Sequence, residues 1–235
     1  MRGAHATALA LFALTAPAAH AQGRIAINAN PSAIIAAEIA LGQLAREKGE
    51  QKAMLDTSVE GVVVVENEPA AVADWLKTRT GSAEPAKWDA RSVWMSCDGV
   101  IGAAEGIWSQ DGESGHFAAV WQLQKKNGYK WVLRHREPAS AIRADPHAFL
   151  TATVADCPAR VEREAPPDTG KPKRRKAKPA PPPPVDPLNG ASPDKSLSWR
   201  SETDTTGSRR LLVQISKEGG MKTVLGAASG TAPQN

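Results

Sequence analysis

Side chains that could carry acid–base, nucleophilic or metal chemistry are few in this chain of 235 residues, which has five histidines and two cysteines. His116, His135 and His147 are the three histidines beyond the N-terminal segment, and they lie far apart in the sequence. The sequence has no His-Glu-x-x-His motif, no paired Cys-x-x-Cys motifs, no Gly-Lys-Ser/Thr phosphate loop and no Gly-x-Ser-x-Gly elbow. We therefore expect no metal site and no cofactor.

The first 21 residues are typical of a secretory signal peptide. Arg2 supplies the positive start, residues 6–16 form an apolar core, and Ala19-His20-Ala21 is a small-x-small cleavage pattern before Gln22. The alternative is an N-terminal membrane anchor, but the apolar core is too short to span a bilayer as a helix. We therefore expect a mature protein that is periplasmic or secreted.

Export changes the interpretation of Cys97 and Cys157. An even number of cysteines in an oxidising compartment favours a disulfide. The alternative is two buried thiols that never meet. A catalytic thiol is less favoured, because neither cysteine has a histidine close to it in the sequence.

Three helices are predicted in the first part of the mature chain. Asn30-Pro31 is a helix start, with Asn as the cap and Pro in the first turn, and the apolar stripe that follows continues to Lys48. Segments 50–56 and 70–79 also have helical spacing. Between them, Val62 to Val65 is a β-branched run typical of a strand.

Four strands connected by tight turns are predicted next. The connecting dipeptides are Asp98-Gly99, Asp111-Gly112 and Asn127-Gly128, which accept the positive φ angles of hairpin turns. Helices followed by an antiparallel meander indicate an α+β fold. The apolar residues 149–154 are either a short helix or an edge segment. The four predicted strands are 91–97, 100–109, 115–125 and 129–136.

Residues 158–194 differ in composition from the rest, because ten of the eighteen prolines lie between Pro166 and Pro193. We expect a disordered linker with stiff polyproline stretches there. Residues 195–226 alternate as three strands, and 227–235 are expected to be a disordered tail. About thirty residues cannot build a core alone, so the extension is predicted to dock on the first domain's sheet through Leu197, Trp199, Leu211, Val213 and Ile215.

The positive charge is concentrated in the linker. The net charge is +4, and residues 171–178 carry six positive charges and no negative one, which leaves −2 for the rest of the chain. An exported chain does not routinely meet nucleic acid, so we expect no nucleic-acid partner. The run is either a solvated spacer or a contact for an anionic envelope surface. Its basic residues are Lys171, Lys173, Arg174, Arg175, Lys176 and Lys178.

Several pieces of residues 30–137 form a recognisable series: LAREKG at 44–49, the segment running through Asp56 into the strand 62–65, ADWL at 73–76, and VWQLQ at 120–124 with NGYKWVL at 127–133. With these pieces the segment resembles the nuclear transport factor two-like superfamily, in particular its SnoaL-like branch. The resemblance implies a cone-like domain over 28–157, with N-terminal helices packed on a curved antiparallel sheet. Members of the superfamily include isomerases, dehydratases, cyclases, hydrolases and many non-catalytic domains, so the fold leaves the function open.

The resemblance implies a mostly apolar pocket between the helices and the sheet. The chain has seven Trp against three Phe and one Tyr, and so many indoles would suit a cage for an aromatic ligand. The same side chains could simply fill the core. The residues predicted to line the pocket are Trp75, Trp94, Trp108, Trp121 and Trp131.

The resemblance also implies where an acid–base residue would lie. Asp56 occupies the place after the second helix, while Glu105, His116 and His135 are the candidates on strands. The chain departs from the isomerase pattern, because its only tyrosine, Tyr129, lies beside a hairpin turn. The paired His and Asp of the dehydratase pattern are not recognisable, and Asp56 is as readily a helix-end residue.

The leading hypothesis is therefore an exported, non-catalytic cone-fold domain that binds a small apolar molecule or a protein partner. The first alternative is an isomerase- or dehydratase-type enzyme that uses Asp56 with His116 or His135. The second is a scaffold that dimerises through its exposed sheet face and stays near the envelope through the basic tail.

Overall fold

The computed structural model describes residues 29–65, 68–78, 84–125, 128–138, 149–157, 188–203 and 209–226. The predicted signal peptide 1–21, His147, the basic run 171–178 and the tail 227–235 lie outside the described residues. So does the predicted linker as far as residue 187.

Three helices precede most of the sheet, as predicted. They are α1 (Ser32–Lys48), α2 (Glu50–Thr57) and α3 (Val72–Thr78). Gly49, with φ of 87°, separates α1 from α2 in a backbone conformation that glycine adopts readily. Within the part of the chain described above, no helix has the length and apolar character needed to cross a membrane.

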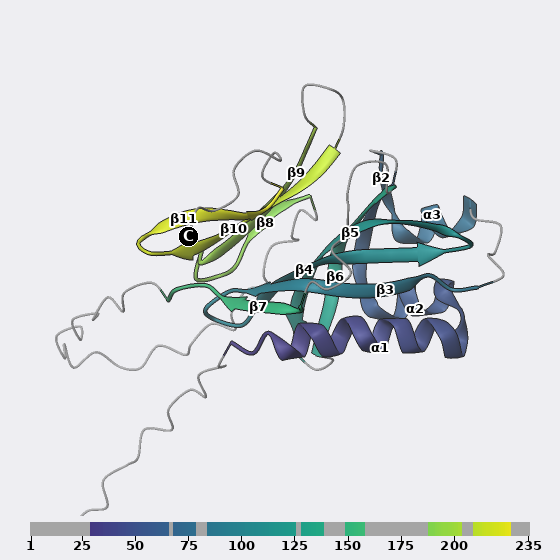
Figure 1. Cartoon of the computed structure of the whole chain (residues 1–235), viewed down its shortest axis with the longest axis horizontal. Helices are drawn as coiled ribbons and strands as arrows, with labels where there is room; N and C mark the ends of the chain where they lie inside the picture. Colours follow the sequence, from purple (N-terminus) through teal and green to yellow (C-terminus); the bar gives the residue numbers. More distant parts are fainter. Residues whose placement is uncertain are drawn as a thin grey trace, which may run out of the picture.

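The helices pack on one face of a curved seven-stranded sheet, and α1 runs along the strands below them in Figure 1. Its order is β2-β1-β6-β5-β4-β3-β7. The sheet is mixed rather than purely antiparallel, because β1 runs parallel to β6 and β7 runs parallel to β3. The meander β3–β6 has the expected antiparallel pairing throughout, and β1 also pairs antiparallel with β2. The strands are β1 (Ser58–Val65), β2 (Glu68–Ala71), β3 (Lys87–Met95), β4 (Ile101–Gln110), β5 (Glu113–Gln124), β6 (Gly128–Pro138) and β7 (Thr151–Val154).

A second, antiparallel sheet is formed by the C-terminal part of the chain. Its strands are β8 (Asn189–Ala191), β9 (Leu197–Thr203), β10 (Arg209–Lys217) and β11 (Gly220–Leu225), in the order β11-β10-β9-β8. The prediction of three strands starting at residue 195 is therefore corrected to four. The strand β8 lies inside the segment predicted as linker, and its three residues are too few to show an alternating pattern.

The large sheet is packed on both faces. The helix-side core, between the sheet and the helices, includes Ile34, Leu41, Met54, Val93, Trp108, Phe117, Trp121 and Trp131. The inter-sheet core, on the opposite face, includes Trp94, Ile101, Ala103, Val120 and Leu133 together with Leu197, Trp199, Leu211, Val213 and Ile215. The five C-terminal residues predicted to dock thus share one buried cluster with the first sheet.

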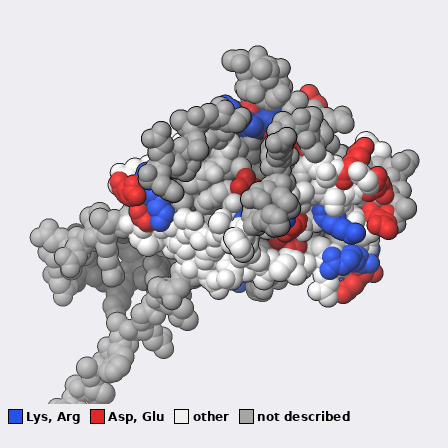
Figure 2. Space-filling model, viewed as in Figure 1, with Lys and Arg blue, Asp and Glu red and all other residues white. Residues whose placement is uncertain are grey.

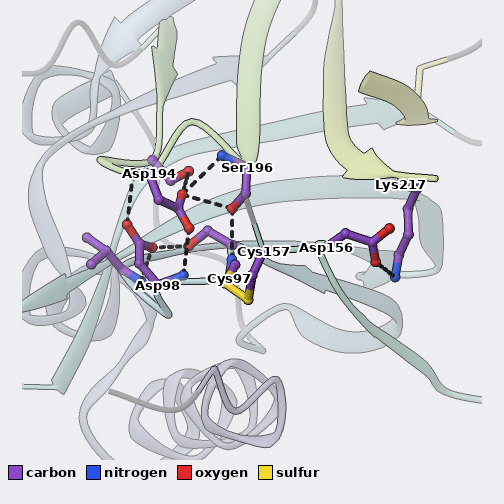
Figure 3. Close-up of a disulfide and its surroundings, with 10 residues drawn as sticks. Cys97, Asp98, Asp156, Cys157, Asp194, Ser196 and Lys217 are labelled. Carbon is purple, nitrogen blue, oxygen red and sulfur yellow. Dashed lines mark hydrogen bonds and ion pairs between the residues drawn. A yellow bond between two sulfur atoms is a disulfide. The ribbon is translucent and has the colours of Figure 1, made fainter. Parts of the chain in front are cut away.

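Polar and covalent contacts hold the two sheets together at one end (Figure 3). Cys97 and Cys157 form a disulfide. Beside it, the Asp156 backbone N–H donates to the Ser216 carbonyl at 2.8 Å, and the Asp156 carboxylate accepts from Lys217 Nζ at 2.8 Å. The disulfide therefore ties β7 to the β3–β4 turn at the place where the second sheet is docked.

Removing the disulfide is expected to lower the free energy of unfolding by about 4 kcal/mol, because it closes a 60-residue separation in the unfolded chain. Urea unfolding of the oxidised and reduced mature protein measures this difference. The Cys97→Ser/Cys157→Ser variant serves as the control, since reductant should leave its midpoint unchanged. Two titratable thiols in oxidised protein would contradict the pairing.

Candidate functional site

A buried ion pair crosses the interior between the helices and the large sheet. Arg134 of β6 donates from Nη2 to Glu38 Oε2 of α1 at 3.0 Å and from Nη1 to Oε1 at 3.3 Å. Trp121 Nε1 donates to the same Oε1 at 2.7 Å. The Arg134 and Glu38 side chains are only 0% and 2% exposed. This two-pronged contact fixes the position of α1 across the middle of the sheet.

Aromatic rings surround the guanidinium of this pair. The Cζ atom of Arg134 lies 4.5 Å from the centroid of Trp88 and 5.1 Å from that of Phe117. Trp88 and Phe117 themselves meet edge to face, with centroids 5.2 Å apart. The electron-rich ring faces attract the cation and partly replace the water lost on burial.

A second arginine, two residues along β6 on the same face, approaches a second glutamate. Arg136 lies over Trp108, 3.9 Å from the ring centroid, and its Nη1 is 3.9 Å from Glu50 Oε1 at the start of α2. The other oxygen, Glu50 Oε2, accepts from Gln110 Nε2 at 2.8 Å. Among the described residues, the buried Oε1 has no hydrogen-bond donor. A separation of 3.9 Å is an ion-pair distance but too long for a direct hydrogen bond.

The surface offers no single-sign patch on the face drawn in Figure 2. Basic and acidic side chains lie side by side at the right-hand end, where α2 and α3 are seen in Figure 1, and a largely uncharged band crosses the middle. Among the described residues on this face, long-range electrostatics therefore favours neither a polyanionic nor a polycationic partner.

Three of the five tryptophans predicted to line a pocket belong to the packed helix-side core. Trp108, Trp121 and Trp131 are buried, and each indole N–H has an acceptor. Trp108 Nε1 donates to the Glu137 carbonyl at 3.1 Å, and Trp131 Nε1 donates to Thr57 Oγ1 at 3.0 Å. Satisfied indoles in a closed cluster are the pattern of core filling.

The other two predicted pocket tryptophans lie elsewhere. Trp75 of α3 is half-buried at the margin of the helix-side core, as is Trp88, which the sequence analysis did not single out. Trp94 faces the opposite way and belongs to the inter-sheet core. The structure thus brings four of the five predicted tryptophans to the helix side and separates Trp94 from them.

The acid–base candidates are divided by the sheet. Asp56 is exposed on α2, and its carboxylate is 2.8 Å from Lys52 Nζ. The hydrogen bond from Lys52 lowers the pKa of Asp56. Glu105, His116 and His135 occupy strand positions that alternate with helix-side residues, so they lie on the face away from the helices. Asp56 and the two histidines therefore do not meet.

The three residues on the far face have partly desolvated environments. Burial raises the pKa of Glu105, and a hydrogen bond from Ser92 opposes this shift. Burial lowers the pKa of His116, and the nearby Glu137 opposes that shift. His135 Nδ1 is 3.1 Å from Glu137 Oε1. Within the part of the chain that the structure describes, no three histidines, cysteines or carboxylates are grouped as a metal would need.

Neither the Glu38–Arg134 pair nor the Glu50–Arg136 pair is predicted from the sequence. Glu38 is a charged residue of α1, and long charged side chains on a helix are normally solvated, yet this one is buried. One signal was available: Arg134 and Arg136 stand two residues apart on a predicted strand that also contains the buried Trp131. Such spacing puts both arginines on one face of the sheet, but it does not show which face.

Comparison with known proteins adds similarity of shape. No protein-family model matches the chain, and no curated protein matches it either. A cystatin-like fold protein from Burkholderia xenovorans has 16% identity over 48% of this chain and 96% of its own, with a TM-score of 0.38. Nuclear transport factor two-like proteins from Silicibacter pomeroyi and Salmonella enterica have 18% and 15% identity. They match 46% and 49% of this chain and 98% and 92% of their own, with TM-scores of 0.35 and 0.34. With TM-scores below 0.5, we draw no conclusion about this chain from them.

Replacing Glu38 by Ala should lower the free energy of unfolding by about 3–5 kcal/mol, because Arg134 would keep a buried charge without its partner. Urea unfolding followed by tryptophan fluorescence measures this. The double variant Glu38→Leu/Arg134→Met is the matched control and should recover most of the loss, since it removes both charges. A single variant as stable as the wild type would show that the pair is not buried in solution.

Replacing Glu105 by Gln should stabilise the protein at neutral pH and leave it unchanged in acid. A raised carboxyl pKa means that ionisation opposes folding, so wild-type stability falls as the pH rises from the unfolded-state value through the folded-state pKa. Urea midpoints of both proteins between pH 4 and pH 8 test this, with the exposed Glu113→Gln as control. A difference that grows toward acid would contradict the sign.

Proposed function

We propose that the chain is an exported, non-catalytic binding protein of the nuclear transport factor two-like type and of its SnoaL-like branch. We propose further that it holds a small molecule beside Glu50 and Arg136. The observation that carries this proposal is the buried Glu50 Oε1, which has no hydrogen-bond donor among the described residues and faces a guanidinium 3.9 Å away. A buried acceptor left without a donor is costly unless a bound group supplies one.

The surroundings of Glu50 indicate the chemistry of the ligand. Trp108 lies against Arg136, and the half-buried Trp88 lies 5.4 Å from the Arg136 Cζ atom. Because Arg136 already lies over the buried Trp108, the half-buried Trp88 is the ring that could contact an apolar or aromatic body, and Glu50 Oε1 suits a hydroxyl or amide donor on it. An aromatic ring carrying one hydrogen-bond donor therefore fits this group of residues better than a purely apolar molecule.

The distribution of acid–base groups supports binding without turnover. Proton transfer needs a titratable group within hydrogen-bond reach of the reacting atom. Asp56 is exposed and paired with Lys52, whereas Glu105, His116 and His135 lie across the sheet from it. Glu38 is already bound by Arg134 and Trp121. The isomerase- or dehydratase-type alternative thus has no pair of these groups directed at one place.

Export is supported by two independent features of the chain. The first is the N-terminal pattern of Arg2, an apolar core and a small-x-small site. The second is the Cys97–Cys157 disulfide, a bond that persists mainly in oxidising compartments. We therefore propose a periplasmic or secreted location.

The binding proposal is tested with phenol and benzamide as probes on the mature protein, residues 22–235. Saturation-transfer NMR should detect both probes on the wild type, and Glu50→Gln should weaken binding about tenfold, because a neutral amide oxygen replaces the charged acceptor. Exposed Glu47→Gln on α1 is the matched control and should bind as the wild type does. Equal binding by Glu50→Gln and the wild type, or no binding by either, would refute the proposed site.

A further inference from the structure

The β3–β4 turn has an unusual set of hydrogen bonds. The Ser96 hydroxyl donates to Asp98 Oδ1 at 2.6 Å, and the Val100 backbone N–H donates to the same oxygen at 2.9 Å. The Ile101 N–H donates back to Ser96 Oγ at 3.1 Å, and Gly99 has φ of 68°. A serine and an aspartate two residues apart thus organise the turn.

The β8–β9 turn repeats this arrangement bond for bond. The Ser192 hydroxyl donates to Asp194 Oδ1 at 2.6 Å, the Ser196 N–H donates to that oxygen at 3.0 Å, and the Leu197 N–H donates to Ser192 Oγ at 3.0 Å. Lys195 stands where the first turn has glycine, and it too has a positive φ, of 62°. The two turns therefore have one design, Ser-x-Asp-x-x-aliphatic.

The two turns also bind each other reciprocally (Figure 3). The Asp98 N–H donates to Asp194 Oδ2 at 2.8 Å, and the Asp194 N–H donates to Asp98 Oδ2 at 3.1 Å. Exchanging Asp98 and Asp194 thus leaves the pair of hydrogen bonds the same. Such equivalence is typical of an interface with twofold symmetry. The Cys97 N–H also donates to Ser196 Oγ at 2.8 Å. Its twofold counterpart is impossible, because Pro193 has no N–H to donate.

The strands after the turns repeat as well. Residues that stand opposite one another on neighbouring strands form a row across each sheet. The row across β3–β6 is Trp94–Ala103–Val120–Leu133, and the corresponding row across β8–β11 is Gly190–Trp199–Val213–Leu225. The register of β5 with β6 shifts between Val120 and Trp121, and that of β10 with β11 shifts at the corresponding place, between Val213 and Gln214. A shared β-bulge is a specific feature, because bulges are local irregularities with defined positions.

The two rows face each other in the inter-sheet core. The large and the small side chain of the first two strands are interchanged between the two rows. In the first sheet the row has Trp94 on the first strand and Ala103 on the second. In the second sheet the tryptophan is on the second strand, because Trp199 stands opposite Gly190. A Cβ atom on Gly190 would lie 2.4 Å from the Trp199 ring. Both rows thus keep one indole, and the face between the sheets stays apolar in both copies.

The faces turned away from this interface differ in polarity between the two sheets. In the large sheet this face packs on the helices, and a Cβ atom on Gly102 would lie 2.5 Å from Ile34 of α1. In the second sheet Ser198 occupies the place of Gly102, and polar residues replace the core residues next to it. The replacements are Ala104 by Arg200, Phe117 by Arg210, Trp121 by Gln214 and Trp131 by Thr223, whereas the apolar Leu212 stands in the place of Ala119.

We propose that β8–β11 is a second copy of the β3–β6 meander that has kept its interface side and lost its helices, and that it covers the large sheet as a second chain would in a twofold dimer. The occupant of this sheet face is the chain's own C-terminal segment. The protein is accordingly a monomer, and the dimer through this face that the sequence analysis considered is replaced by an internal contact.

A cross-link between the sheets decides whether the covering segment belongs to the same chain. Lys217 Nζ and Asp156 Oδ1 are 2.8 Å apart, so a carbodiimide can join them as an amide with loss of water. Unlabelled and nitrogen-15-labelled protein are mixed, unfolded in urea with the disulfide intact, and refolded together. All 156–217 cross-links should join peptides of one label, and light scattering should give the mass of one chain. Mixed-label cross-links at about half of the total, as random pairing gives, or a stable dimer would overturn the proposal.

A matched pair of variants tests the role of the covered face. Val213→Asp places a charge in the inter-sheet core and should speed amide exchange in β4 and β5 by more than about tenfold, with self-association through the uncovered face. Gln214→Asp, the next residue on the outer side, should remain monomeric with unchanged exchange. Unchanged exchange and mass in Val213→Asp would count against the proposal. If that variant does not fold, the cross-link and mass of the wild type still decide.

Discussion

The large sheet carries apolar side chains on both of its faces, and the rest of the structure follows from the need to cover them. A sheet with one apolar face can leave the other in water. Here Trp121 points to the helices while its neighbour Val120 points to the second sheet, and both are almost completely buried. Helices α1–α3 cover one face and β8–β11 cover the other. Removing the helices would expose the helix-side core, and removing the second sheet would expose the inter-sheet core.

The buried ion pair has a different role from this apolar packing. Moving two charges out of water opposes folding, and an apolar pair of the same volume is often at least as stable. The Glu38–Arg134 pair is instead directional, since both guanidinium nitrogens and the Trp121 indole converge on one carboxylate. A helix that slid along the sheet would leave these charges without partners. The pair therefore defines where α1 sits, whereas the apolar contacts only require that some helix covers the sheet.

Local chemistry made much of the fold predictable, and long-range pairing limited the rest. The Asp-Gly and Asn-Gly turns predict a meander, because each dipeptide accepts the positive φ angles that a hairpin turn requires. By contrast, β1 pairs in parallel with β6 across more than sixty residues, and nothing in the local sequence of either strand specifies that partner. The site was harder still, because Glu38 and Arg134 have the same side-chain types as solvated surface residues. The spacing of Arg134 and Arg136 puts both on one face of a strand, but the assembled interior is needed to show that this face is buried.

The internal repeat was hidden from the sequence for a related reason. A copied meander keeps only those residues that its new position still requires. Ser192 and Asp194 persist because they form the turn, and Val213 persists because it faces the other sheet. The positions that once would have packed on helices are free to become polar, and a shortened turn shifts the spacing between the strands. The pairing register of the strands therefore reveals the repeat, although few residues are identical between the two copies. Among the described residues no helix covers the outer face of the second copy, whereas the helix side of the large sheet holds the ion pair of Glu50 and Arg136.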